Sequence, residues 1–513
     1  MLEVAGGPRD GLRRPEAFCL TEPGAVGEVE SMPRKILCVA CLFAVPALAA
    51  GQTSASNPLA PYISMDAPVV ALEHVEVIDG TGGPAQMDQT IVIDHGKIAS
   101  VGASASAAVP AGAKVLDLTG HTVYPGLVGM HEHLFYTEPG STTLHGLVVG
   151  ELVDTAPRLY LAAGVTTART AGSISPYTDL NLRKEIDAGL IPGPDLDVTG
   201  PYLEGNPPLI PQMHILTGPE DARRMVDYWA QEGVTSWKAY MHISPAELKA
   251  AIDEVHAKGE KITGHLCAVG FTEAAELGID NLEHGIAVDT EFTPGRKEGQ
   301  CPRNAVPYLA DHVAMDSPPV ETMIHTLVQK HVAVTSTLAV LESFVPNHPP
   351  MAFMLHERDS LPPTAWEGIL TTRAQLLENA AKSSWPVMIK KEMQFEREFV
   401  AAGGHLMAGC DPTGYGAVLP GFGDQRNLEL LVEAGFTPEQ AIEIATKNGA
   451  EYLGRADRIG TISVGKQADL VVVKGDVAKD ITAVEHVETV FKNGVGFDSE
   501  KLIESVRGMV GFR

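Results

Sequence analysis

Hydrophobic and polar positions follow two patterns along the chain. Residues 69–118 contain short β-rich runs separated by Gly-containing turns, which predicts a small sheet. From residue 122 onward, short apolar runs alternate with stretches of helical periodicity, as is typical of βαβ units around a parallel sheet. After residue 453 short strands return, with Gly465 and Gly475 at the turns. The order predicts a barrel whose two flanks join in a second, β-rich domain.

The middle of the chain holds eight candidate strands, the number that closes a (β/α)8 barrel. We therefore predict an α/β fold, a (β/α)8 TIM barrel with a small β-sandwich domain built from both chain ends. The expected bounds are 66–122 and 453–513 for the sandwich and 123–452 for the barrel. The eight runs are 123–130, 165–169, 196–200, 235–241, 261–266, 281–284, 332–338 and 405–409.

Residues 1–50 form an upstream extension and a candidate signal peptide. The basic segment 32–35 precedes an apolar run, 36–44, and the small-residue end 47–50, which is the pattern of a cleavable secretory signal. The run is too short for a comfortable membrane span, so we expect no stable span after cleavage and a periplasmic or secreted protein. An uncleaved membrane anchor is the alternative, and both Met1 and Met32 are candidate starts.

The charge of the chain limits the kinds of partner that it can bind. The chain carries 38 Lys and Arg against 65 Asp and Glu, a net charge of -27. This balance argues against a nucleic-acid partner, because phosphate binding needs clustered cations, and a small-molecule substrate is expected instead. Homo-oligomers are compatible with this composition.

Signal cleavage would leave three cysteines, Cys267, Cys301 and Cys410. This odd number allows one disulfide bridge without identifying its pair.

Residues of metal-binding type lie where the predicted strands end. His131 and His133 are two residues apart, so in a strand both point to the same face. His265, His284 and Asp411 each end a different predicted strand. The carboxyl ends of barrel strands face one shared cavity, where imidazole nitrogen and carboxylate oxygen suit Zn²⁺ and related divalent ions. The pattern predicts a metal site, with ordinary turn histidines as the alternative for the His131–His133 pair taken alone.

Lys238, in a further predicted strand, is the unexpected member of this group. A protonated ammonium would be repelled by two cations, so Lys238 fits a two-ion site only if carboxylation by CO₂ turns it into an oxygen donor. A salt bridge at the barrel rim beside a single metal ion is the alternative. Tyr240, two residues later on the same strand face, is a candidate substrate contact. His214, in the loop after the third strand, is a second one, with a solvent-facing position as its alternative.

Two segments of the chain resemble the amidohydrolase superfamily. Residues 125–133, Pro-Gly-Leu-Val-Gly-Met-His-Glu-His, are similar to its first-strand metal motif, and residues 460–473 are similar to its return into the sandwich. The resemblance implies two divalent ions, expected to be zinc. His131 and His133 would bind the buried ion with Asp411, His265 and His284 would bind the exposed ion, and carboxylated Lys238 would bridge both.

The lysine in strand four and the secretory signal resemble one branch of this superfamily in particular. That branch contains Xaa-Pro dipeptidases and Xaa-Arg/Lys carboxypeptidase-like enzymes, is related to imidazolonepropionases and includes ochratoxin-type amide hydrolases. Its members often carry an aromatic residue two places after the strand-five histidine, where this chain has Cys267. The way in which a substrate carboxylate would be held is therefore not transferable.

The resemblance implies cleavage of the amide bond of a dipeptide or an N-acyl amino acid by a metal-bridging hydroxide. Asp411 would accept the proton of the hydroxide and pass it to the leaving nitrogen. Hydrolysis of a cyclic amide, carbamate or lactone by the same centre is one alternative. A non-catalytic binding protein on the same fold is another, and it predicts missing ligands, whereas all six candidate positions are filled.

Overall fold

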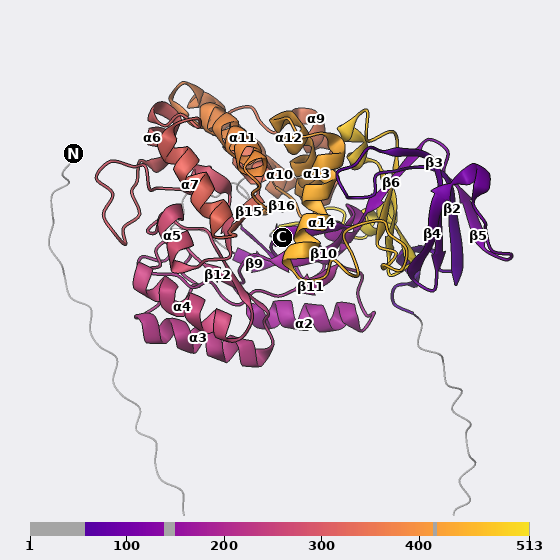
Figure 1. Ribbon diagram of the computed structural model, residues 1–513, viewed down its shortest axis with the longest axis horizontal. Coiled ribbons are helices and arrows are strands. Elements are labelled where there is room, and N and C mark those ends of the chain that lie inside the picture. The colour runs from indigo at the N-terminus through magenta and orange to yellow at the C-terminus, as the bar shows by residue number, and fades with distance from the viewer. Residues whose placement is uncertain (1–56, 138–148, 414–417, 512–513) are drawn as a thin grey trace, which may run out of the picture. The chain divides into compact units, whose positions relative to one another are not determined.

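Two groups of strands organise the residues that the computed structural model describes, which are 57–137, 149–413 and 418–511 (Figure 1). One group is a sheet built from both chain ends, and the other is a set of parallel strands that alternate with helices. The predicted signal peptide lies outside the described residues. Within them, no helix has both the length and the apolar character needed to cross a membrane.

The parallel strands form two ladders, β11-β10-β7 and β12-β13-β14-β15-β16. Parallel bridges between Thr199 and Ser236 and between Leu203 and Ala239 cross one seam between the ladders. At the other seam, the Asp411 amide donates to the His131 carbonyl at 2.9 Å. This is a TIM-barrel-like α/β arrangement whose ladder hydrogen bonds do not run unbroken around it. The strands are β7 (Leu127–Glu132), β10 (Val165–Thr170), β11 (Asp195–Asp197), β12 (Ser236–Ala239), β13 (Lys261–Gly264), β14 (Asn281–Glu283), β15 (Ala333–Ser336) and β16 (Leu406–Ala408).

The run 123–130, predicted as one strand, is split between the two groups. β6 (His121–Pro125) belongs to the sheet of the chain ends, and β7 starts the parallel set. The switch lies at Gly126, whose amide bonds the Asp469 carbonyl at 2.8 Å, whereas the next amide, of Leu127, bonds the Gly164 carbonyl at 2.9 Å. Gly126 suits this crowded junction, because a Cβ there would lie 2.1 Å from the Thr166 hydroxyl.

The sheet of the chain ends runs in the order β1-β19-β18-β17-β6-β2-β3-β4, with β5 paired to β2. β6 joins its two halves, because it pairs antiparallel with β17 and parallel with β2. The pairing shows that both ends of the chain contribute strands to one sheet. The folding of this sheet into a sandwich stays a prediction. Its other strands are β1 (Ile63–Met65), β2 (Val69–Val77), β3 (Gln86–Asp94), β4 (Lys97–Ala103), β5 (Lys114–Asp117), β17 (Leu470–Lys474), β18 (Val487–Lys492) and β19 (Val495–Asp498); a separate short pair is formed by β8 (Phe135–Thr137) and β9 (Val149–Glu151).

Helices follow most of the parallel strands, and the long connections after β14 and β15 each contain several helical segments. α4 begins with a capping box, in which Ser244 and Glu247 satisfy each other's backbone amides. The helices are α1 (Ala156–Ala162), α2 (Pro176–Asp187), α3 (Pro219–Glu232), α4 (Pro245–Ala257), α5 (Phe271–Leu277), α6 (Ala305–His312), α7 (Pro318–Gln329), α8 (Leu338–Glu342), α9 (Met351–Glu357), α10 (Pro363–Glu378), α11 (Trp385–Ala401), α12 (Phe422–Ala434), α13 (Pro438–Ala445), α14 (Lys447–Tyr452) and α15 (Ser499–Glu504).

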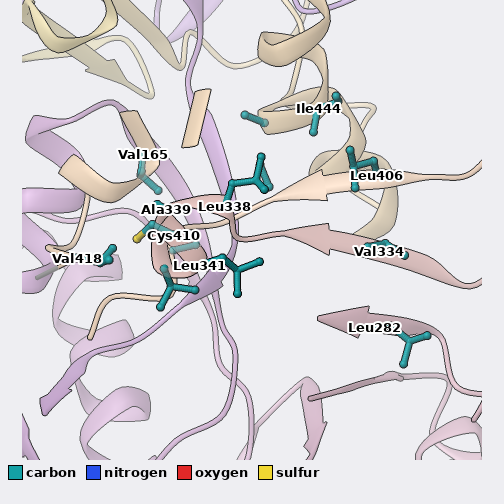
Figure 2. Packing of buried hydrophobic residues seen from close by; sticks show 14 of the residues in the cluster. Val165, Leu282, Val334, Leu338, Ala339, Leu341, Leu406, Cys410, Val418 and Ile444 are labelled. Carbon is teal, nitrogen blue, oxygen red and sulfur yellow. The ribbon is translucent and has the colours of Figure 1, made fainter. Parts of the chain in front are cut away.

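Side-chain alternation along these strands separates an apolar layer from a polar interior. Leu282, Val334 and Leu406 are register partners on β14, β15 and β16, and all three are buried in the apolar cluster shown in Figure 2. Asn281 and Glu283 flank Leu282 and therefore face the other way. Burial of the apolar row fixes the strand register, since a slip of one residue would exchange the two faces.

A disulfide joins Cys267 to Cys301, with their Cα atoms 4.9 Å apart, and Cys410 is a buried free thiol. Cys267 lies two residues after His265, in the segment that follows β13. Cys301 lies in the segment between β14 and α6. The bridge therefore ties two connections together beside a candidate metal ligand.

Replacing Cys301 by Ser is expected to lower the free energy of unfolding by ~2–4 kcal/mol, since the bridge closes a loop between positions 34 residues apart. Urea unfolding of the variant and of wild type measures the difference. Reductant should destabilise wild type by a similar amount and leave the variant unchanged. Equal stability of the oxidised and reduced wild-type protein would contradict this expectation.

Candidate metal centre

Five predicted ligands come together at the carboxyl ends of the parallel strands. Asp411 Oδ1 lies 3.1 Å from His133 Nε2 and 3.7 Å from His131 Nε2, and its Oδ2 lies 3.8 Å from His284 Nε2. The ring of His284 lies 4.6 Å from that of His131 and 4.4 Å from that of His265, measured between centroids. The carboxylate of Asp411 is thus surrounded by imidazoles from β7 and β14.

Left-handed backbone at two positions makes this convergence possible. His284 directly follows Glu283, and neighbouring strand residues normally face opposite sides. His284 has φ of +66° and Asp411 has φ of +52°, conformations that cost about 1–2 kcal/mol each in a residue with a Cβ. The turn at His284 returns its ring to the face that Glu283 occupies. Backbone strain at both residues is consistent with a functional constraint.

The donor set fits a divalent ion. His131, His284 and Asp411 each offer one ligand atom, and these atoms all lie within 4.8 Å of one another. His284 Nε2 is buried without a hydrogen-bond partner among the described residues, although its Nδ1 lies 2.7 Å from the Thr337 hydroxyl. A buried imidazole nitrogen held in this way, and aimed at a carboxylate, is what a metal ligand requires.

Lys238 lies at the base of this group, on β12. Its side chain is only 1% exposed, and Nζ has no hydrogen-bond partner in the described part of the chain. The nearest carboxylate in an ion pair, Glu283, is 3.9 Å away. Burial lowers the pKa of Lys238 to about 8. The geometry is therefore that of a weakly compensated buried amine rather than of a well-formed salt bridge.

Burial also sets the protonation of the other groups. It lowers the pKa of His131, His265 and His284 well below the ordinary value, because the imidazolium form loses its hydration. Burial alone would raise the pKa of Asp411, but the neighbouring His131 and the hydrogen bond with His133 outweigh it and lower that pKa. Neutral imidazole and ionised carboxylate are the forms that bind metal ions.

The two predicted substrate contacts have different surroundings. Tyr240 packs against the rings of His265, at 5.1 Å, and Tyr202, at 4.6 Å. Its position beside a candidate ligand agrees with a place at the edge of the site. His214 is 39% exposed, and its Nε2 lies 2.8 Å from Asp221 Oδ2 on α3. The structure therefore ties His214 to the helix that follows its loop.

The sequence did not single out Glu283 and Arg169, which are fully buried directly beneath the ligands. Glu283 Oε2 accepts from His131 Nδ1 at 2.8 Å, and its Oε1 accepts from Arg169 at 2.8 Å. Two signals were available in the sequence. Arg169 is the one charged residue in the predicted strand 165–169, and Glu283 immediately precedes His284. A charged residue inside a buried strand needs a partner, so the pair could have been sought.

Cys410 and Glu132 are sequence neighbours of candidate ligands, but their side chains contact each other. The Cys410 thiol donates to Glu132 Oε2 at 3.0 Å, and both residues are completely buried. Burial raises the pKa of this thiol well above its ordinary value. A thiol in that state is a poor nucleophile, so we interpret Cys410 as a packing residue.

Fold and site together define a TIM-barrel-like α/β protein with a candidate metal centre at the strand ends. The family model described as the amidohydrolase family matches residues 122–495. The chain belongs to the amidohydrolase family. An imidazolonepropionase of Parabacteroides distasonis is 44% identical over 61 residues, which are 11% of this chain and 15% of that relative. The chain therefore aligns with only about a seventh of that curated relative's length.

Solved structures match over most of the chain. The crystal structure of a putative prolidase from Bifidobacterium longum has a TM-score of 0.62 and 25% identity, covering 85% of this chain and 98% of that one. A Xaa-Pro dipeptidase with methionine bound in its active site has the same TM-score at 20% identity, covering 84% of this chain and 100% of that one. These matches support the fold.

Proposed function

We propose that this protein is a binuclear metal-dependent hydrolase that cleaves the amide bond of a dipeptide or an N-acyl amino acid. The observation that carries the proposal is the meeting of His131, His284 and Asp411, whose ligand atoms lie within 4.8 Å of one another at the strand ends. His133 and His265 add two more imidazoles to this group. Membership of the amidohydrolase family supports hydrolysis of a C–N bond.

His131, His133 and Asp411 would hold one ion, His265 and His284 would hold the other, and Lys238, once carboxylated, would supply oxygen ligands. Bound divalent ions would polarise the substrate carbonyl and lower the pKa of a water molecule. Asp411 accepts a proton at its carboxylate and returns it to the leaving nitrogen, which makes one group serve as base and then as acid.

We infer the class of substrate from the aromatic rings beside the candidate ligands. Phe135 stacks on His133 at 4.5 Å, and the rings of Tyr202 and Tyr240 continue this row toward His265. Such rings favour a substrate that carries an apolar group beside its scissile amide. The prolidase and the Xaa-Pro dipeptidase among the similar structures point to the same class of compound. Tyr240, and in second place His214, are the proposed substrate contacts.

Metal loading and a substrate panel test the proposal. We expect about two divalent ions per chain by elemental analysis, and we expect chelation to remove activity that Zn²⁺ or Mn²⁺ then restores. The panel contains dipeptides, including Xaa-Pro, N-acyl amino acids, cyclic amides and lactones. Turnover confined to cyclic amides or lactones would replace the proposed substrate class. A single tightly bound ion in a fully active enzyme would contradict the binuclear centre.

We also propose that the two parallel ladders close as a barrel and that the sheet of the chain ends folds as a sandwich.

Export of the protein is a further part of the proposal, because residues 32–50 have the composition of a secretory signal. Cell fractionation with N-terminal sequencing tests export, and an uncleaved protein in the cytoplasm would contradict it.

A further inference from the structure

A carboxylate lies under the proposed metal ligands without being one of them. Glu283 is the last residue of β14 and is 0% exposed. Its Oε2 lies 2.8 Å from His131 Nδ1, and a carboxylate can only accept, so Nδ1 carries the proton. We propose that Glu283 is a positioning residue that fixes His131 in the tautomer whose Nε2 is free to bind the buried ion. The inference rests on the proposed metal centre.

Glu283 is itself held from several sides. Its Oε1 accepts from Arg169 at 2.8 Å and from the Thr263 hydroxyl. The same guanidinium donates through Nε to the Met130 carbonyl at 2.8 Å and also donates to Asn281 Oδ1. Met130 directly precedes His131, so Arg169 connects the backbone of the ligand strand to the carboxylate that orients the ligand ring. A forked guanidinium can make these contacts together, whereas an ammonium cannot.

An amide in place of this carboxylate would remove the tautomer control. The side chain of Gln has one accepting oxygen and a donating NH₂ group. If the NH₂ group faced His131, Nδ1 would have to accept, and the ring proton would move to Nε2, which could then bind no metal. If the oxygen faced His131, the NH₂ group would meet Arg169, also a donor. The first orientation therefore removes the free Nε2, and the second leaves a donor facing a donor in a buried site, which is costly.

Glu283 hydrogen-bonds one proposed ligand, His131, whereas Nζ of Lys238, the proposed shared ligand, lies 3.9 Å from its Oε1, too far for a hydrogen bond. The effect is therefore expected chiefly at the ion that His131 binds. Glu283 contacts His131, which is assigned to the buried ion, and it precedes His284, which is assigned to the exposed ion. The His284 ring is held separately, by Thr337 at 2.7 Å. Loss of the carboxylate should therefore weaken one binding event more than the other. A general loss of structure would weaken both.

The experiment compares E283Q and E283D with E357Q in full-length protein. Glu357 is also 0% exposed, but its carboxyl oxygens have no hydrogen-bond partner among the described residues, so E357Q controls for replacing a buried carboxyl group by an amide. Metal-free proteins are titrated with Co²⁺ against a competing chelator, and the visible absorption of each bound equivalent is recorded. We expect E283Q to weaken one of two binding events by about 10–100-fold, the range for lost outer-shell partners, while E357Q keeps both.

E283D keeps the negative charge in the buried site, but its shorter side chain withdraws the carboxylate from His131. It therefore tests the inference even if E283Q does not fold. We expect E283D also to weaken one event and to alter the spectrum of that equivalent. Wild-type affinity for both equivalents in a folded E283Q or E283D would overturn the inference. Failure of wild type to bind two equivalents would instead refute the proposed metal centre, so the two failures are distinguishable.

Discussion

Replacing Lys238 by Ala is expected to lower kcat/KM by ~10³-fold or more, a loss of about 4 kcal/mol of transition-state stabilisation. Lys238 is the only proposed ligand shared by both ions, and its buried Nζ has no hydrogen-bond partner in the described residues. Removing it would leave both ions one ligand short. Acetate at high concentration should partly restore activity by filling the space. Initial rates with and without acetate, together with metal content, measure the effect.

Lys238→Arg separates the bridge from a simple ion pair. A permanent guanidinium cannot be carboxylated and would face two cations, so activity should stay as low as in the Ala variant. The salt-bridge alternative, represented by the 3.9 Å distance to Glu283, expects Arg to be accepted. Full activity in Lys238→Arg would therefore refute the bridging role.

Asp411→Asn is expected to lower kcat by roughly 10²–10⁴-fold, the usual contribution of a general acid–base group, while most of the metal stays bound. The four histidines and the bridge would still hold the ions, but an amide can neither accept nor return the proton. Elemental analysis beside single-turnover rates distinguishes the two effects. Normal turnover in a fully metal-loaded Asp411→Asn protein would exclude proton transfer by this residue.

The sequence allowed the parallel strands to be located because their burial leaves a plain signal. The run 332–338 begins with Val-Ala-Val, lies between helical stretches and has no charged residue, and the structure places β15 within it. The prediction of one strand over 123–130 was wrong. The run has no charged residue to mark a break, and the change of partner strand at Gly126 depends on tertiary contacts. Hydropathy records that a segment is buried, but it does not record which sheet buries it.

The candidate ligands could also be predicted from the sequence, but the residues that hold them in place could not. Each ligand is a histidine, lysine or aspartate at a strand end, a position that can be read from one segment alone. The link from His131 to Glu283 spans strands far apart in sequence, and the approach of His284 to the same group depends on a left-handed turn. No local pattern encodes such a pair. The Cys267–Cys301 bridge was undetermined for the same reason, since spacing alone allowed other pairs.

The pairing of β6 with β17 has a consequence for how the chain comes to be folded during its synthesis. Pro125 lies opposite Leu470, so these strands come from opposite flanks of the whole parallel region. Contacts between such distant segments form slowly, because a long loop must close before they stabilise anything. Until the ribosome has released the carboxyl-terminal strands, β6 presents an unpaired edge to the cell, and this edge is open to chaperones or to other chains.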